Sequence, residues 1–242
     1  MIKRKAEKYI NNWIKNPSRA LLVTGARQVG KTFTIRKCLQ ESKCNYVEIN
    51  LIQNSEFIAA LKQANTVDEL KLNISALTDV TFADNETFLF IDEVQECKDI
   101  VTKVKFWVDD GRIKLVLSGS LLGVELKDLR SAPVGYMDEL DMYPLDFEEF
   151  ITASGVTSET IDYLKKCFFE KSPVTDVINN KMLTHLNRYL VIGGMPAAVN
   201  AYVETGNVGE VSIIQENIIR QYKVDFTKYE TEDKKLMLTA IY

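Results

Sequence analysis

The residues best suited to chemistry form a glycine-containing loop near the N-terminus. Residues 25–32 read Gly-Ala-Arg-Gln-Val-Gly-Lys-Thr, the complete pattern G-x-x-x-x-G-K-[ST]. Gly25 and Gly30 lack a Cβ, so successive backbone N–H groups can point inward at phosphate oxygens. Lys31 can then reach the β- and γ-phosphates, and the Thr32 hydroxyl can bind Mg²⁺. The alternative is a plain strand-to-helix turn with an ordinary surface lysine. The predicted phosphate and nucleotide contacts are Gly25, Ala26, Arg27, Gln28, Val29, Gly30, Lys31, Thr32 and Phe33.

Two carboxylates follow a second apolar stretch. Residues 87–91 read Thr-Phe-Leu-Phe-Ile, and Asp92 and Glu93 come directly after them. A strand that is apolar on both faces is typical of the centre of a parallel sheet, and open α/β sheets bind ligands at the C-terminal ends of their strands. We therefore predict that Asp92 holds Mg²⁺ through water and that Glu93 polarises the attacking water. The alternative is that the Asp-Glu pair only caps a helix.

A third apolar stretch, residues 114–117, ends in Ser118-Gly119-Ser120. In P-loop proteins that hydrolyse ATP and have an extra strand between the first strand and the Asp-Glu strand, a polar residue here contacts the γ-phosphate or the water. Ser118 is the candidate for this sensor, and Ser120 is the second choice. The alternative is a Ser-Gly-Ser turn without a catalytic role.

These three sites need a sheet with helices between its strands, and the pattern of the chain supplies one. An amphipathic helix with apolar residues at positions 6, 10, 13 and 14 is expected at the start, ending near residues 16–17. Strands and helices then alternate up to an edge strand at 136–142. After Pro144 the pattern is helical throughout, beginning with a capping box at residues 146–149. We expect an α/β core over residues 1–143 with the first helix packed on it, followed by a helical lid or linker domain over residues 144–242. The apolar run at the end hints at truncation.

Charge is unevenly spread along the chain. The net charge is −4 and the pI about 5.3, which argues against a broad nucleic-acid surface. Residues 1–40 nevertheless contain ten Lys or Arg and one acid, a local charge of +9, which leaves −13 for the rest. Either this segment attracts a polyphosphate or nucleic acid, or it docks on an acidic body.

Other features exclude several classes of protein. The four cysteines form no Cys-x-x-Cys pair and His185 is the only histidine, so neither a zinc site nor a disulfide framework is expected. The apolar runs are too short to cross a bilayer, and the N-terminus has no apolar signal core. We expect a cytoplasmic protein without membrane contact.

Taken together, the chain resembles prokaryotic AAA-type ATPases of the archaeal-ATPase-like, STAND-related clade, which are mostly described only as ATP-binding proteins. The resemblance covers essentially all 242 residues. It is carried by GARQVGKT, FLFIDEVQE, LSGSLLGVELK, APVGYMDELDMYPLDFEEF, YLVIGGMPAAV and IIRQYKVDFTKY. It implies the P-loop NTPase fold with a parallel sheet of order 5-1-4-3-2, and a helical lid. It also implies a longer parent protein, whose following domain looks nuclease-like in many relatives.

The resemblance suggests two further site residues. Pro196, in the Gly-Gly-Met-Pro stretch of residues 193–196, resembles the lid element that meets adenine in STAND-type ATPases; a plain helix break is the alternative. Many relatives carry Gly-Arg before the fifth strand, where this chain has Gly135 and Tyr136. Arg130 lies in the region from which AAA-type proteins project an arginine into a neighbouring subunit. It either acts in this way in a homo-oligomer or is a solvated loop residue of a slow monomer.

We therefore expect a Mg²⁺-dependent ATPase that uses ATP to move a helical lid. An ATP-dependent switch with little turnover and a small-molecule kinase are the alternatives. A GTPase is disfavoured because the chain has no Asn-Lys-x-Asp stretch. The sequence does not identify the protein client.

Overall fold

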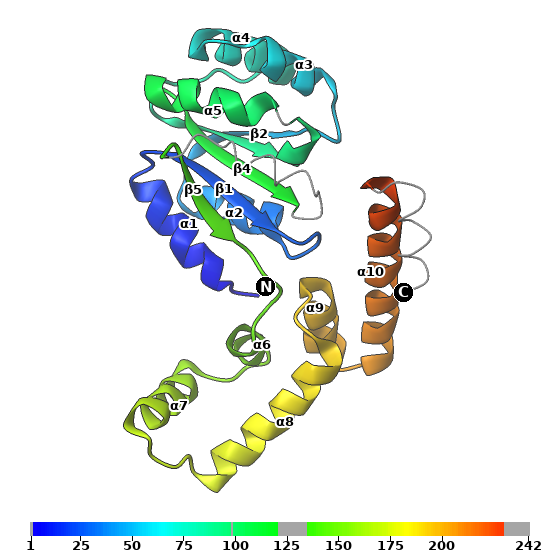
Figure 1. Cartoon of the computed structure of the whole chain (residues 1–242). Helices are drawn as coiled ribbons and strands as arrows, with labels where there is room; N and C mark the ends of the chain where they lie inside the picture. The colour runs from blue at the N-terminus through cyan, green and yellow to red at the C-terminus, as the bar shows by residue number, and fades with distance from the viewer. Residues whose placement is uncertain (1, 98, 121–134, 230–242) are drawn as a thin grey trace. The chain divides into compact units, whose positions relative to one another are not determined.

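The computed structural model describes residues 2–97, 99–120 and 135–229 of the chain. It divides into two compact units (Figure 1). One unit is Ala6–Met142, and the other combines Met1–Lys5 with Tyr143–Tyr242. Arg130 and the apolar run at the end lie outside the described residues, so the expectations placed on them stay predictions.

The first unit is built on a five-stranded parallel sheet of order β2-β3-β4-β1-β5. This confirms the expected α/β fold with the order 5-1-4-3-2. Every residue of β1 and β3 is buried, as the apolar stretches predict for central strands. The fifth strand lies at the edge of the sheet, and none of its residues is fully buried. The strands are β1 (Ala20–Gly25), β2 (Asn45–Asn50), β3 (Thr87–Asp92), β4 (Lys114–Ser120) and β5 (Met137–Asp141).

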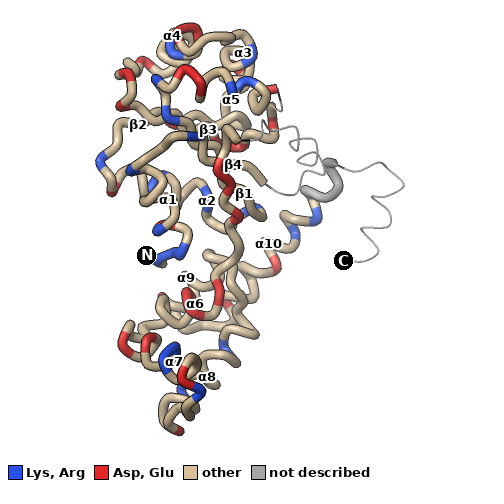
Figure 2. Tube along the Cα trace, turned by 60° about the vertical axis from the view of Figure 1, so that its left-hand side comes forward, with Lys and Arg blue, Asp and Glu red and all other residues tan. Residues whose placement is uncertain are grey.

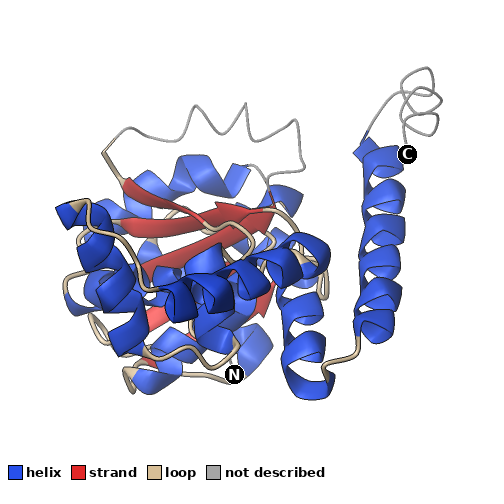
Figure 3. Cartoon of the chain, turned by 90° about the horizontal axis from the view of Figure 1, so that it is seen from below, coloured by secondary structure: helices blue, strands red, loops and turns tan. Residues whose placement is uncertain are grey.

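Helices cover both faces of this sheet (Figure 1, Figure 3). One face carries α3, α4 and α5, and the other carries α1 and α2. On α1, Ile10, Trp13 and Ile14 are buried as the amphipathic pattern predicts, and Trp13 packs edge-on against Phe88 of β3. The helices of this unit are α1 (Lys5–Lys15), α2 (Lys31–Glu41), α3 (Glu56–Gln63), α4 (Val67–Thr78), the short 3₁₀ helix η1 (Val94–Glu96) and α5 (Asp99–Asp110).

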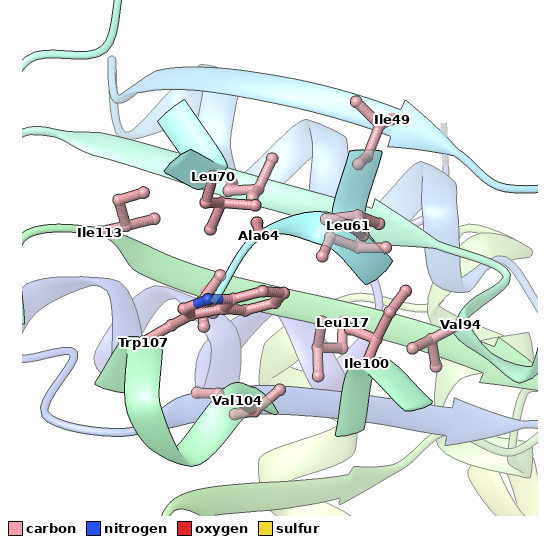
Figure 4. Close-up of a cluster of buried hydrophobic side chains, with 14 of the residues drawn as sticks. Ile49, Leu61, Ala64, Leu70, Val94, Ile100, Val104, Trp107, Ile113 and Leu117 are labelled. Atoms are coloured by element: carbon pink, nitrogen blue, oxygen red, sulfur yellow. The ribbon is translucent and has the colours of Figure 1, made fainter. Parts of the chain in front are cut away.

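The larger core lies between the sheet and the face that carries α3, α4 and α5 (Figure 4). Trp107 of α5 is fully buried there, among Leu61 and Leu70 from α3 and α4 and Leu117 from β4. Because this core joins the helices to the central strands, it holds the C-terminal ends of β3 and β4 in place.

The second unit consists of helices in its described part. Leu145, Phe150, Ile151, Val199 and Val211 are among its buried residues. The expected capping box is present, because Asp146 and Glu149 each accept a hydrogen bond from the backbone N–H of the other. The helices are α6 (Phe147–Ala153), α7 (Ser158–Glu170), α8 (Asp176–Ile192), α9 (Pro196–Thr205) and α10 (Val208–Tyr229).

Gly194, in the turn between α8 and α9, is fixed by close backbone contact. The N–H of Leu145 donates to the Gly194 carbonyl at 2.7 Å. A Cβ on Gly194 would overlap the backbone of Leu145. The Tyr189 hydroxyl donates to the Leu145 carbonyl at 2.6 Å, so the end of α8 is tied to the start of α6 from two directions. Within the described residues, no helix is both long and apolar enough to cross a membrane.

The basic N-terminal segment pairs with acidic residues, which supports the interpretation that it docks on an acidic body. Figure 2 shows Lys and Arg residues along this stretch. Arg4 forms a buried pair with Glu149, which also accepts a hydrogen bond from the backbone N–H of Lys5 at 2.6 Å. These contacts explain why the first five residues belong to the second unit. Further pairs with acids outside the segment are Lys5–Asp146, Lys5–Glu148, Arg19–Asp138 and Arg36–Glu48, and Lys37 pairs with Glu7 inside the segment.

Two neighbouring aromatic residues of α5 test the role of the core. Trp107 is fully buried, whereas Phe106 is 61% exposed. We expect Trp107→Ala to lower the free energy of unfolding by about 3–5 kcal/mol, because it leaves a large cavity. Phe106→Ala is the matched control and should change it by less than about 0.5 kcal/mol. Urea denaturation measures both, and equal effects of the two substitutions would contradict this description of the core.

Candidate functional site

The loop between β1 and α2 has the backbone that its glycines predict. Gly25 (φ 148°) and Gly30 (φ 93°) both have positive φ. A Cβ on Gly25 would overlap the Met142 carbonyl oxygen, so only glycine fits at the end of β1. Gly30 precedes the first turn of α2, which no side chain caps. The N–H groups of that turn and the positive end of the helix therefore suit an anion.

Lys31 is buried at the start of this helix and is 7% exposed. Its Nζ donates to the carbonyl oxygens of Gly25 and Ala26, both at 2.9 Å. Burial lowers the pKa of Lys31, and the negative charges of Glu93 and Asp92 partly oppose that shift. A buried ammonium group favours an anionic partner, and a phosphate at this loop would provide one.

Asp92, at the end of β3, is the centre of a hydrogen-bond network and is 3% exposed. Its Oδ2 accepts from Thr32 Oγ1 at 2.9 Å and from Asn50 Nδ2 at 3.1 Å. Its Oδ1 accepts from the Ser118 hydroxyl and from the backbone N–H of Glu93 at 3.1 Å. The two residues predicted to hold Mg²⁺, Thr32 and Asp92, are thus in direct contact.

The register of the sheet explains why Asn50 and Ser118 lie beside Asp92. Asn50 of β2 lies opposite Asp92, and Leu117 of β4 lies opposite Ile91, so Ser118 comes level with Asp92 on the other side. The ends of three parallel strands therefore present polar side chains at one edge, as expected for an open α/β sheet.

The oxygen ligands at this edge suit Mg²⁺, which prefers carboxylate, hydroxyl and phosphate oxygens. Within the described residues, no group of three or more His, Cys, Asp or Glu side chains is arranged to hold a metal ion. A metal at Thr32 and Asp92 would therefore need oxygens from water and a phosphate ligand as well, which fits a nucleotide-bound Mg²⁺.

Glu93 follows Asp92 in a left-handed backbone conformation (φ 59°, ψ 45°) and precedes η1. Its side chain is half-buried, and its charge acts on Lys31. Its Oε2 accepts a hydrogen bond of 2.5 Å from Gln95 Nε2. Glu93 therefore follows the candidate metal residue Asp92 in the chain and acts electrostatically on the phosphate-loop lysine. Its role as a general base stays a prediction.

Ser118 and Ser120 differ in their contacts. Ser118 is fully buried, with its hydroxyl on Asp92. The backbone N–H of Ser120 donates to Gln95 Oε1 at 3.2 Å. The structure therefore brings Ser118 to the network around Asp92, and its contact with a γ-phosphate or water stays a prediction.

Three predicted site residues are not part of the described contacts around Asp92. Phe33, in the first turn of α2, is 48% exposed. Pro196 is the first residue of α9 in the second unit, and its contact with adenine stays a prediction. Arg130 lies outside the described residues.

Sequence reasoning missed two amides at the site, Asn50 and Gln95. Asn50 Oδ1 accepts from the backbone N–H groups of Ile52 and Gln53 at 3.0 and 3.1 Å, while its Nδ2 holds Asp92. Gln95 joins Glu93 to Ser120. Asn50 could have been found from its place at the C-terminal end of a predicted strand, next to the Asp-Glu strand.

Two segments of the chain match known protein families. Residues 17–151, more than half of the chain, match a family described as an AAA domain. Residues 183–242 match a family described as a domain of unknown function (DUF8612). No curated protein matches the chain.

Several solved structures are similar to this chain at low sequence identity. C. elegans PCH-2 is 14% identical with a TM-score of 0.45, over 86% of this chain and 69% of that one. The Pif1 helicase of Candida albicans is 17% identical with a TM-score of 0.41, over 67% of this chain and 47% of that one. A katanin structure is 14% identical with a TM-score of 0.41, over 64% and 55% of the two chains. This chain thus spans about half the length of the Pif1 and katanin chains.

The TM-scores of these structures are all below 0.5, so the family assignment does not rest on them. The family match covers the phosphate loop, the whole sheet and the network around Asp92. On that match the chain belongs to the AAA domain family.

Proposed function

We propose that this chain binds ATP with Mg²⁺ at the loop of residues 25–32 and hydrolyses it. The observation that carries the proposal is the contact of 2.9 Å between Thr32 and Asp92, flanked by the buried Lys31 and by Glu93. A phosphate-binding lysine, two oxygen ligands for a metal and a carboxylate beside them are the parts that ATP hydrolysis needs.

Each part has a distinct role in the proposal. The backbone N–H groups of the loop and Lys31 hold the β- and γ-phosphates. Thr32 and Asp92 would hold the metal, Asp92 through water, and the metal would neutralise charge on the phosphates. Glu93 accepts a proton from the attacking water, and Ser118 is the proposed sensor of the γ-phosphate or the water. Movement of the second unit as a lid is part of the same proposal.

Substitutions of Glu93 and Lys31 should separate catalysis from binding. We expect Glu93→Gln to keep ATP affinity within a few fold and to lower the rate of hydrolysis by about 10²-fold or more, because the general base is lost. Lys31→Ala should instead weaken ATP binding by about tenfold or more, because a charged hydrogen bond to phosphate is lost. Titration with ATP and steady-state phosphate release measure the two effects. Equal rates for wild type and Glu93→Gln would remove Glu93 from catalysis and favour a switch with little turnover.

The proposed lid contact predicts where Pro196 lies when ATP is bound. The neighbouring glycines allow close approach of the backbone, and the proline ring offers an apolar surface with no N–H left unpaired. We expect the ring to lie within about 4–4.5 Å of adenine. A crystal structure with a non-hydrolysable ATP analogue tests this, and an adenine without contact to Pro196 would show that residues 193–196 only interrupt the helices.

Arg130 is the proposed source of the positive charge that Tyr136 cannot supply. An arginine that reaches the γ-phosphate contributes about 10³ to 10⁵ in rate. If Arg130 acts across a subunit interface, activity per chain rises with protein concentration, and a mixture of Arg130→Ala with Lys31→Ala regains activity. The Arg130→Ala chain then supplies an intact phosphate loop, and the Lys31→Ala chain supplies Arg130. A mixture no more active than its two components would show that Arg130 does not act in this way.

A further inference from the structure

The side chain of Gln95 is held at both ends. Its Nε2 donates to Glu93 Oε2 at 2.5 Å, and its Oε1 accepts from the backbone N–H of Ser120 at 3.2 Å. A backbone N–H can only donate and an ionised carboxylate can only accept. The orientation of the Gln95 amide is therefore fixed by its partners, with the NH₂ group toward Glu93.

Close packing restricts the movement of this amide. A Cβ on Gly119 would come within 3.0 Å of Gln95 Oε1 and 3.1 Å of Val94 Cγ1, so β4 leaves no spare room on this side. Val94, the neighbour of Gln95 on η1, is fully buried in the core. Gln95 is thus anchored through its backbone by the core and through its side chain by the end of β4.

Glu93 needs such support. Its left-handed backbone conformation costs a non-glycine residue about 1–2 kcal/mol, and its side chain has three rotatable bonds. A general base must be held within hydrogen-bond distance of the proton that it accepts. The bond from Gln95 uses one of the two acceptor sites of Oε2 and fixes the plane of the carboxylate, so that Oε1 has a defined position from which to accept a proton from water.

We propose that Gln95 is a positioning residue for the ATP hydrolysis proposed above. It holds the Glu93 carboxylate in the orientation that accepts the proton, and it joins that orientation to the end of β4. This inference rests on the proposed function. The alternative is that Gln95 only ties η1 to β4, without an effect on the chemistry of Glu93.

Substitution of Gln95 by Glu isolates the contact with Glu93. The new carboxylate can still accept from the Ser120 N–H, but it cannot donate to Glu93 and repels it. We expect kcat to fall by about 10- to 100-fold, the usual cost of misplacing a reacting group. The Kd for ATP should stay within about threefold, because Gln95 contacts no part of the phosphate loop in the described hydrogen bonds. Glu96→Gln, an exposed change on the same short helix, is the matched control and should leave kcat unchanged.

A double-mutant cycle distinguishes positioning from a structural tie. If Gln95 acts through Glu93, Gln95→Glu should cause no further loss of kcat in the Glu93→Gln background. Losses that multiply would overturn the inference, because they would show an effect independent of Glu93. Gly119→Ala is a second variant, since its methyl group would press on the Gln95 amide and on Val94 Cγ1 without altering Glu93 or Ser120 themselves. It should also lower kcat and leave the Kd for ATP unchanged.

The nucleotide-free protein gives a readout that does not depend on activity. In ¹⁵N NMR spectra, hydrogen exchange of the Gln95 side-chain amide should be slower than that of the exposed Gln63 amide by at least about tenfold, because its hydrogen bond is charge-assisted. Glu93→Ala should abolish this protection. Protection that persists in Glu93→Ala would overturn the inference.

The outcomes distinguish failure of the proposed ATP hydrolysis from failure of the proposed role of Gln95. If wild type hydrolyses no ATP, the proposed function fails and the inference fails with it. If Glu93→Gln hydrolyses ATP as fast as wild type, Glu93 has no catalytic role, so the inference about Gln95 fails although ATP hydrolysis stands. If Glu93→Gln is inactive but Gln95→Glu and Gly119→Ala hydrolyse ATP at the wild-type rate, only the role of Gln95 is overturned.

Discussion

The buried carboxylate of Asp92 is the constraint on which the rest of the site depends. A carboxylate that is 3% exposed is stable only if its oxygens are paired. Asp92 meets this need with four hydrogen bonds, which come from α2, β2, β4 and the residue that follows it in the chain. The bonds to side chains bring Thr32, Asn50 and Ser118 to one point. The hydrogen bonds that stabilise the buried Asp92 carboxylate therefore also assemble the candidate metal site.

Much of this arrangement could be predicted from the sequence, because its motifs carry backbone constraints. The Gly25 position admits no Cβ, and the strand that ends in Asp92 is apolar on both faces, which requires a central place in a parallel sheet. The phosphate loop and the place of Thr32 and Asp92 at one edge of the sheet follow from these two features, whereas the strand order was implied by the resemblance to a known family. The capping box at Asp146 also follows, because its hydrogen bonds are local in sequence.

Other contacts could not be predicted, because they depend on register and on single backbone conformations. The position of Asn50 at the end of a strand places it at this edge of the sheet, but its hydrogen bond to Asp92 depends on the register in which β2 and β3 pair. Gln95 reaches Glu93 through the turn that Glu93, with its positive φ, forms just before η1. Ser118 was predicted as a γ-phosphate sensor, but no pattern indicated that its hydroxyl would donate to Asp92. Likewise, the helical periodicity of the N-terminal segment does not reveal that Arg4 pairs with Glu149.

The central claim is that the contacts around Asp92 form a site for Mg²⁺ and ATP that hydrolyses the nucleotide. The most direct test is phosphate release by the wild-type protein, with ATP as the phosphate donor and no acceptor besides water, in Mg²⁺ and in excess EDTA. The account predicts release that saturates with ATP and is lost in EDTA. ATP that binds without release of phosphate above background, or release that is unchanged in EDTA, would contradict it.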